Sequence, residues 1–206
     1  MKKIDQNKKQ KRDALLNTAF ELFTTQGINK TTINNIVDAA GVAKGTFYLY
    51  FKDKYDIRNK LIAHKASHIF SIADAALSQT DLTELEDRII FLVDNIIGQF
   101  SADKSLLNFI SKNLSWGIFK NELISSSDDS DVDFYNIYKI LESSPRAFKD
   151  PEILLFMIVE LVSSTCYSSI LYHEPTDIES FKPYLFDAIR LLIKSHRTAL
   201  PQEQSL

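Results

Sequence analysis

A short polar and aromatic stretch near residue 50 holds the side chains best suited to chemistry in this sequence. Lys44, Thr46, Tyr48, Tyr50 and Lys54 each carry a hydrogen-bond donor. Ammonium groups, hydroxyls and phenols of this kind donate to phosphate oxygens and to the edges of bases. The stretch therefore predicts contacts with nucleic acid.

The other reactive side chains form no recognisable catalytic or metal centre. The serines have no evident His–Asp partners, and no glycine-rich loop is present to cradle a phosphate. His64 and His68 are four residues apart, a spacing that can bind a metal, but the sequence places no third ligand beside them. Cys166 lies in an apolar segment, where an inert buried thiol is expected. We expect no enzyme activity, no metal site and no cofactor.

Two short helices joined by a tight turn are predicted to position the polar stretch. Thr31 and Thr32 offer capping hydroxyls to the first helix, over residues 33–40, and Gly41 ends it because glycine permits a positive φ. The second helix covers residues 44–50. The pair has the shape of a helix-turn-helix, whose second helix enters the major groove of DNA.

The second helix has an inner and an outer side. Phe47 and Phe51 are four residues apart and face the core. Lys44, at the start of the helix, is placed where recognition helices meet base edges. The Thr46 methyl group can lie against a thymine, and Gly45 lets the backbone approach the groove. The positions expected to point outward or to the flanks are Gly45, Thr46, Tyr48 and Leu49.

Phosphate contacts are expected around the helix pair. Tyr48 and Tyr50 carry phenols that bond phosphates, Thr32 directs a hydroxyl and a helix N-terminus toward the opposite wall of the groove, and Lys54 opens the following helix. Residues 1–60 contain twelve Lys or Arg and six Asp or Glu, whereas the remainder contains twelve and 21. A basic head on an acidic body predicts a polyanion at one end of the protein.

The remaining sequence is also predicted to be helical, so the fold class is all-α. Apolar residues recur at helical spacing, and only five Gly and five Pro occur in 206 residues. An Asp81–Glu84 capping box and Asp150 followed by Pro151 mark two helix starts. Predicted helices cover residues 8–26, 33–40, 44–50, 54–76, 82–100, 106–112, 114–124, 134–141, 151–172 and 181–197.

The most apolar segment, Ile153–Tyr172, is expected to be a buried helix. It contains Glu160 and several hydroxyl residues, which make a poor bilayer span. The single cysteine forms no internal disulfide, which favours a reducing compartment. Residues 1–12 are basic, but no apolar stretch follows them, so we expect no signal peptide. These features predict a cytoplasmic protein without membrane contact.

Residues 11–61 strongly resemble the DNA-binding domain of the TetR family of bacterial repressors. The resemblance does not extend to the C-terminal two thirds, which match only in helix count and length. Asn34 and Asn35 stand where charged residues are frequent in the family, and Ala43 stands where serine often precedes the lysine. The resemblance rests on Gly27, Thr31–Ile33, Ile36, Ala39–Val42, Lys44–Phe51 and Lys54.

The resemblance implies a fold, a partner and a role. It implies a helix-turn-helix head over residues 1–53 and a larger helical domain over residues 54–206 for ligand binding and dimerisation. It implies transcriptional regulation, with repression expected, by a dimer on a palindromic operator. Position by position it implies DNA contacts from Thr32, Ala43, Lys44, Gly45, Thr46, Tyr48, Tyr50 and Lys54.

A pocket for a small-molecule effector is a further implication. Any one aromatic residue of the middle helices is most simply core, but bundles with bulky aromatic side chains often enclose apolar pockets. The aromatic side chains of these helices favour a neutral or apolar effector. The expected lining residues are Phe109, Trp116, Phe119, Tyr135, Phe156 and Tyr167.

The last two long helices are predicted to form a homodimer. Residues 151–172 and 181–197 are apolar over more than one face, so each helix needs cover on both sides. We expect them to pair with their copies as a four-helix bundle. One alternative remains open, a DNA-binding adaptor controlled by a protein partner with no small ligand. A fully packed C-terminal core favours that adaptor, and an apolar cavity favours the ligand-responsive regulator.

Overall fold

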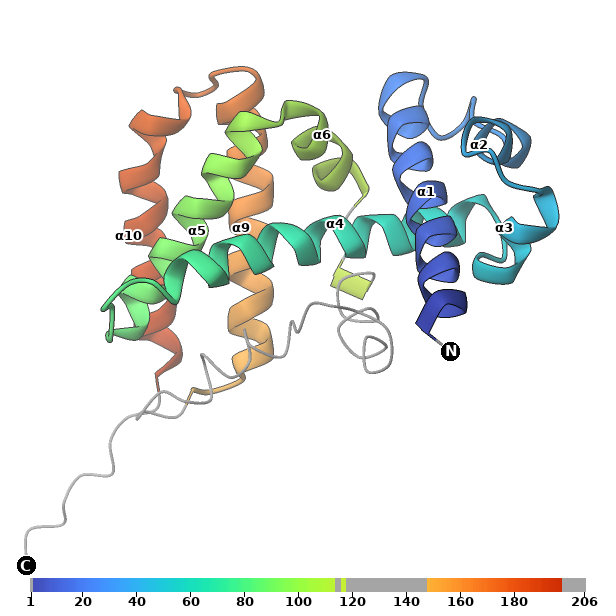
Figure 1. The fold of residues 1–206 in the computed structure, drawn as a ribbon. Coiled ribbons are helices and arrows are strands. Elements are labelled where there is room, and N and C mark those ends of the chain that lie inside the picture. Colours follow the sequence, from blue (N-terminus) through green and yellow to red (C-terminus); the bar gives the residue numbers. More distant parts are fainter. Residues whose placement is uncertain (1, 114–115, 118–147, 198–206) are drawn as a thin grey trace, which may run out of the picture. The chain divides into compact units, whose positions relative to one another are not determined.

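The computed structural model describes residues 2–113, 116–117 and 148–197. Within them every named element is a helix, and β structure amounts to one isolated bridge between Phe148 and Arg197 (Figure 1). The predicted all-α class is confirmed. The helices are α1 Lys2–Thr25, α2 Ile33–Ala39, α3 Lys44–Tyr50, α4 Lys54–Leu77, α5 Leu85–Ala102, α6 Lys104–Asn113, α9 Pro151–Leu171 and α10 Ile178–His196.

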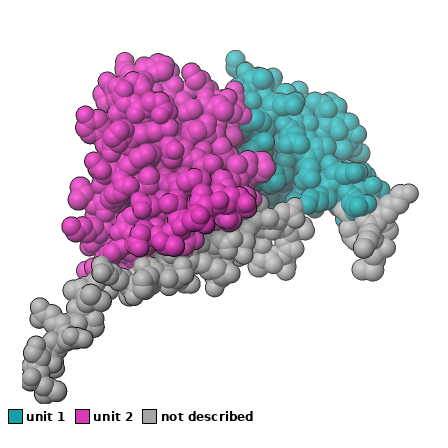
Figure 2. Space-filling view, turned by 60° about the vertical axis from the view of Figure 1, so that its left-hand side comes forward, with its two compact units in different colours: residues 1–65, 113–122 teal, residues 66–112, 123–206 magenta. Residues whose placement is uncertain are grey.

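Two compact units divide the chain. Unit 1 comprises residues 1–65 and 113–122, and unit 2 comprises residues 66–112 and 123–206 (Figure 2). The division falls inside α4, whereas the sequence placed a domain boundary after residue 53. That functional boundary stays a prediction, because compact units report packing rather than role.

In unit 1, α1, α2 and α3 pack against one another. Leu15 of α1, Ile36 of α2 and Phe47 of α3 are completely buried, as the apolar periodicity of each helix requires. Two glycines make the turns between these helices. Gly27 follows α1 with φ 85°, and Gly41 follows α2 with φ 65°, a backbone region in which glycine carries no side-chain penalty.

In unit 2, α9 and α10 lie side by side and both contact α5 (Figure 1). Ion pairs join α10 to α5: Lys182 Nζ lies 2.9 Å from Asp94 Oδ1, and Arg190 Nη2 lies 3.3 Å from Asp87 Oδ1. Burial acts to lower the pKa of Lys182, but the carboxylates of Glu179 and Asp94 outweigh it and raise that pKa. The pairs fix which side of α10 faces α5.

Helix α9 is long and apolar enough, by length and composition alone, to cross a membrane. Leu154, Ile158 and Cys166 on it are nevertheless buried within unit 2, where α9 packs against α5 and α10. A helix that contributes to the core in this way needs no bilayer to cover it. The structure therefore agrees with the expectation of a buried core helix.

The structure corrects one predicted helix start and confirms another without its side-chain cap. The Asp81–Glu84 capping box is wrong, because α5 begins after Glu84 and that residue makes no side-chain capping bond. Asp150 and Pro151 do open α9, but Asp150 has φ 53° and its side chain makes no capping bond. The predicted helix at 134–141, and that at 114–124 apart from residues 116–117, lie outside the described residues.

Candidate nucleic-acid interface

The start of α2 is fixed by a reciprocal cap between Thr32 and Asn35. Thr32 Oγ1 accepts a hydrogen bond from the Asn35 backbone N–H at 3.1 Å, and Asn35 Oδ1 accepts one from the Thr32 backbone N–H at 2.9 Å. The Thr32 hydroxyl also donates to Asn35 Oδ1 at 2.7 Å. The predicted capping role of Thr32 is confirmed. Its predicted phosphate contact stays a prediction, and the cap shows that the hydroxyl proton already has an acceptor.

The turn between α2 and α3 is closed by backbone hydrogen bonds. The Val42 N–H donates to the Val37 carbonyl at 3.0 Å, and the Thr46 N–H donates to the Ala43 carbonyl at 2.8 Å. Ala43 is the N-cap of α3, with φ −68° and ψ 145°. A side chain without hydrogen-bonding groups at this position leaves the first turn of α3 open to an outside acceptor.

Helix α3 is anchored through its aromatic side. Phe47 is completely buried and Phe51 is almost so, and their ring centroids lie 5.5 Å apart. The Tyr48 ring stands edge-on to Phe47 at 5.5 Å, and the Tyr50 ring lies 6.3 Å from Phe51. The phenylalanines thus hold the two tyrosines at the flanks of the helix, as the inward assignment of Phe47 and Phe51 predicted.

The opposite side of α3 is open to solvent. Lys44 and Gly45 are exposed, Tyr48 is 53% exposed, and Thr46 and Tyr50 are half-buried. A Cβ atom built on Gly45 would meet no atom within 4 Å, so the space beside the helix backbone is open there. An open helix face with a lysine at its first position is placed to meet another surface.

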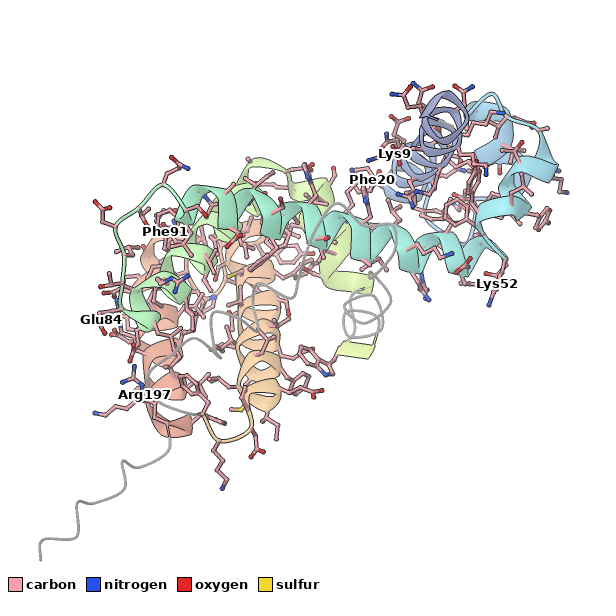
Figure 3. All side chains as sticks on the ribbon, turned by 60° about the horizontal axis from the view of Figure 1, so that its bottom comes forward. Lys9, Phe20, Lys52, Glu84, Phe91 and Arg197 are labelled. Carbon is pink, nitrogen blue, oxygen red and sulfur yellow. The ribbon has the colours of Figure 1, made fainter. Side chains whose placement is uncertain are left out.

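Two lysines join the segment after α3 to earlier parts of unit 1. Lys54 Nζ donates to the Ile28 carbonyl at 2.8 Å, which fixes the start of α4. Lys60 Nζ donates to the Tyr50 carbonyl at 3.1 Å and lies 3.4 Å from Asp56 Oδ2. Lys60 therefore satisfies an acceptor at the C-terminus of α3, where a positive charge is also favoured by the helix dipole. Lys52, exposed between α3 and α4, is labelled in Figure 3.

The structure gathers the predicted DNA-contact residues in unit 1. Ala43, Lys44, Gly45, Thr46, Tyr48 and Tyr50 belong to α3 or its cap, while Thr32 caps α2 and Lys54 opens α4. Sequence reasoning missed the roles of Asn35 and Lys60. Asn35 three residues after Thr32 has the capping-box spacing and was recognisable. Lys60 acts on a carbonyl ten residues earlier, which no local pattern indicates.

The predicted ligand-binding residues are not gathered in one place as the predicted DNA-contact residues are. Phe109 is buried on α6, Phe156 on α9 is 38% exposed, and the Tyr167 phenol donates to Asn108 Oδ1 at 3.3 Å. Trp116 is assigned to unit 1, whereas these three belong to unit 2. Phe119 and Tyr135 lie outside the described residues. A shared pocket stays a prediction.

The remaining reactive groups considered are a buried thiol and two exposed imidazoles. Burial raises the pKa of the Cys166 thiol to about 12, so the thiol is protonated at neutral pH. His64 and His68 are both exposed on α4. Among the described residues no three His, Cys, Asp or Glu side chains gather to hold a metal ion.

A family model and curated relatives match the chain in sequence. The model described as bacterial regulatory proteins, tetR family, matches residues 15–61. The HTH-type transcriptional regulator AcrR of Shigella flexneri is 35% identical over 68 residues, which are 33% of this chain and 32% of that protein. This match spans only about a third of AcrR. An HTH-type transcriptional regulator of Staphylococcus aureus (strain USA300) is 23% identical over 187 residues, covering 87% of this chain and 92% of that protein.

Solved structures match the fold over most of the chain. A tetR family transcription regulator from Shewanella sp. PV-4 has a TM-score of 0.64 at 17% identity and covers 92% of this chain and 99% of that one. The fatty acid degradation regulator FadR from Bacillus halodurans has a TM-score of 0.60 at 19% identity, covering 88% and 97%. At these identities the likeness is one of fold.

Proposed function

Because the chain is a TetR-family DNA-binding transcriptional regulator, we propose that it acts as a homodimeric repressor on a palindromic operator and releases DNA when a small apolar effector binds. The family is not enzymatic, and we assign no catalytic role. The open outer face of α3, with Lys44 at its first position and Gly45 beside it, carries the DNA-binding part of the proposal. We assign the protein to the cytoplasm, where such an operator is found.

In this proposal, the first residues of α3 recognise the base sequence of the operator. Lys44 donates to base edges, Thr46 contacts a base or a phosphate, and Gly45 admits the backbone to the groove. Tyr48, Tyr50 and two remaining donors of the Lys54 ammonium hold phosphates. Ala43 and the Thr32-capped N-terminus of α2 supply backbone N–H groups to the adjacent strand.

Apolar side chains exposed on α9 and α10 support the homodimer. Ile153 is 51% exposed on α9, and on α10 Tyr184 and Leu191 are 74% and 67% exposed. Tyr184 and Leu191 are seven residues apart, so they line one face of α10 two turns apart. Leu185 and Ile189 of the same helix are buried, which makes α10 apolar on two sides. A second copy of this surface provides the missing cover.

The effector acts through the separation of the two heads. In a dimer, recognition helices reach successive major grooves when they lie about 34 Å apart. An effector that binds more tightly to a dimer of different spacing draws the population away from the DNA-binding state. The aromatic residues predicted to line the pocket support an effector without charge. The description of a similar fold as a fatty acid degradation regulator makes long-chain acyl compounds the first probes.

The DNA-binding role is tested by Lys44→Ala combined with Thr46→Ala. Duplexes bound by the full chain are selected from a randomised DNA pool, and the preferred duplex is footprinted against random DNA. The double variant should keep its helical content and its mass in solution while losing preference for that duplex. Unchanged preference would overturn the assignment of α3 as the recognition helix.

The dimer is tested by Tyr184→Glu combined with Leu191→Glu, with Leu82→Glu as the control. Leu82 is also an exposed leucine of unit 2 but lies outside α9 and α10. Light scattering should report a monomer for the double variant and a dimer for the control. A dimer in both would place the subunit contact elsewhere.

The effector model is tested by adding long-chain acyl compounds to the protein–operator complex. Release of DNA, together with a rise in melting temperature of the free protein, supports a small-molecule regulator. Release by a protein from the same cell, with no response to small apolar compounds, supports the adaptor instead.

A further inference from the structure

Leu49 occupies the centre of the outer face of α3. Successive helical residues are rotated by about 100°, so the direction opposite Phe47 falls between Gly45 and Leu49, two residues before and after it. Exposure agrees with this geometry. Phe47 is completely buried, whereas Leu49 is 78% exposed, more than any other large apolar side chain of the described residues.

The neighbouring side chains on α3 do not cover Leu49. Tyr48 and Tyr50 lean sideways onto Phe47 and Phe51, with ring centroids 5.5 Å and 6.3 Å away. Gly45, one turn earlier on the same face, adds no side chain, and a Cβ there would meet no atom within 4 Å. A surface that reaches the Gly45 backbone therefore reaches the Leu49 methyl groups as well.

The charge around Leu49 identifies what covers it. Residues 1–60 carry twelve Lys or Arg against six Asp or Glu, and Lys44 is exposed at the start of the same helix. Leu49 and the half-exposed Tyr48, beside a glycine and a lysine, are too small an apolar surface for a protein partner. A polyanion that also carries isolated apolar groups fits this surface, and DNA presents such a group in its major groove, the C5-methyl of thymine.

We propose that Leu49 is a specificity-determining residue that recognises the 5-methyl group of one thymine in each operator half-site. The inference rests on the proposed function, since it requires α3 to lie in the major groove. The leucine side chain forms no hydrogen bonds with phosphates or base edges, so it contributes to DNA binding by apolar contact. Such contact distinguishes thymine from cytosine and from uracil, neither of which carries the methyl group.

A cycle of protein and DNA variants tests the proposal. The probes are the duplex selected by the wild-type protein and a series of altered duplexes. In each altered duplex, the thymine at one position of both half-sites is replaced by uracil. Replacement at one position should weaken wild-type binding about fourfold for each methyl group removed. Leu49→Ala should bind the thymine and uracil duplexes equally, and selection with this variant should lose its preference at that base pair.

Two comparison variants separate the possible sources of a methyl effect. Thr46→Ser removes the other methyl group available on α3 and keeps the hydroxyl. It should retain the sensitivity to uracil. Leu82→Ala removes an exposed leucine of unit 2 and should behave as wild type throughout.

The outcomes distinguish this inference from the function on which it rests. Wild-type binding that no uracil replacement weakens would overturn the role of Leu49, as would a Leu49→Ala variant that stays as sensitive as wild type. Failure of the wild-type protein to select any preferred duplex would instead overturn the proposed operator binding.

Discussion

Unit 1 and unit 2 both expose large apolar side chains, but the parts of the chain that carry them differ in net charge. On α3 of unit 1, Leu49 and Tyr48 stand beside Lys44 in a region with an excess of basic residues. On α10 of unit 2, Tyr184 and Leu191 stand in the part of the chain that holds 21 acidic residues against twelve basic ones.

Exposure alone therefore does not identify the partner of an apolar side chain. A single leucine in a basic surface suits the groove of DNA, where isolated methyl groups lie between charged walls. Apolar residues repeated along a long helix suit a second helix of the same kind. The two surfaces should therefore respond differently to salt, substitution and temperature.

The largest expected difference is the response to salt. Raising the salt from 50 to 200 mM should weaken operator binding about a thousandfold or more, if six or more phosphates are contacted. Dimerisation through apolar faces should change little over the same range, because no counterions are released. Fluorescence anisotropy and light scattering measure the two equilibria. Equal salt responses would contradict the division into a polyanion surface and an apolar surface.

The next largest difference lies within α3 itself. Phe47→Ala should reduce the free energy of unfolding by about 3–5 kcal/mol, because it empties a completely buried site. Leu49→Ala, two residues away, should change it by less than about 0.5 kcal/mol. Urea denaturation followed by circular dichroism compares the two. A large loss of stability in Leu49→Ala would mean that this side chain serves packing instead of recognition.

A smaller effect is expected at the start of α2. Thr32→Ala removes the acceptor of the Asn35 N–H and should cost about 1 kcal/mol of stability. Thr32→Ser keeps the hydroxyl and should stay close to wild type. Thermal melting of both variants measures the cap. Equal melting of Thr32→Ala and wild type would show that the cap adds nothing to the fold.

The smallest stability change separates folding from binding. Gly45→Ala should stabilise the free protein by about 0.4–1 kcal/mol, because Gly45 is helical and a Cβ there meets open space. The same methyl group should hinder approach to the groove and weaken operator binding. Unchanged DNA affinity in a stabilised variant would show that the Gly45 backbone keeps its distance from the duplex.

The local parts of unit 1 were predictable from sequence because their signals are local. Thr32, Gly41 and the Phe47–Phe51 spacing predicted α2 to within one residue and α3 at both ends. The same kind of signal failed at Asp81, where α5 begins four residues later than the predicted cap. A capping sequence only permits a helix start, and packing of the first apolar residue, here Leu85, selects the one used.

Long-range bonds were beyond the sequence. Lys54 reaches the Ile28 carbonyl across 26 residues, and Lys182 reaches Asp94 from another helix. No sequence pattern near either lysine identifies its acceptor, because the two groups come together only when the helices pack. The outward position of Leu49 was predictable from its spacing from Phe47, but the extent of its exposure required the structure.

The protonated thiol of Cys166 has a practical consequence for measurement. It is the sole cysteine of the chain, completely buried, with a pKa of about 12, so thiol-directed reagents should label the native protein very slowly. A cysteine introduced at an exposed position would then be the only fast-reacting thiol. Fluorophores and spin labels could therefore be attached at a chosen position without first replacing Cys166.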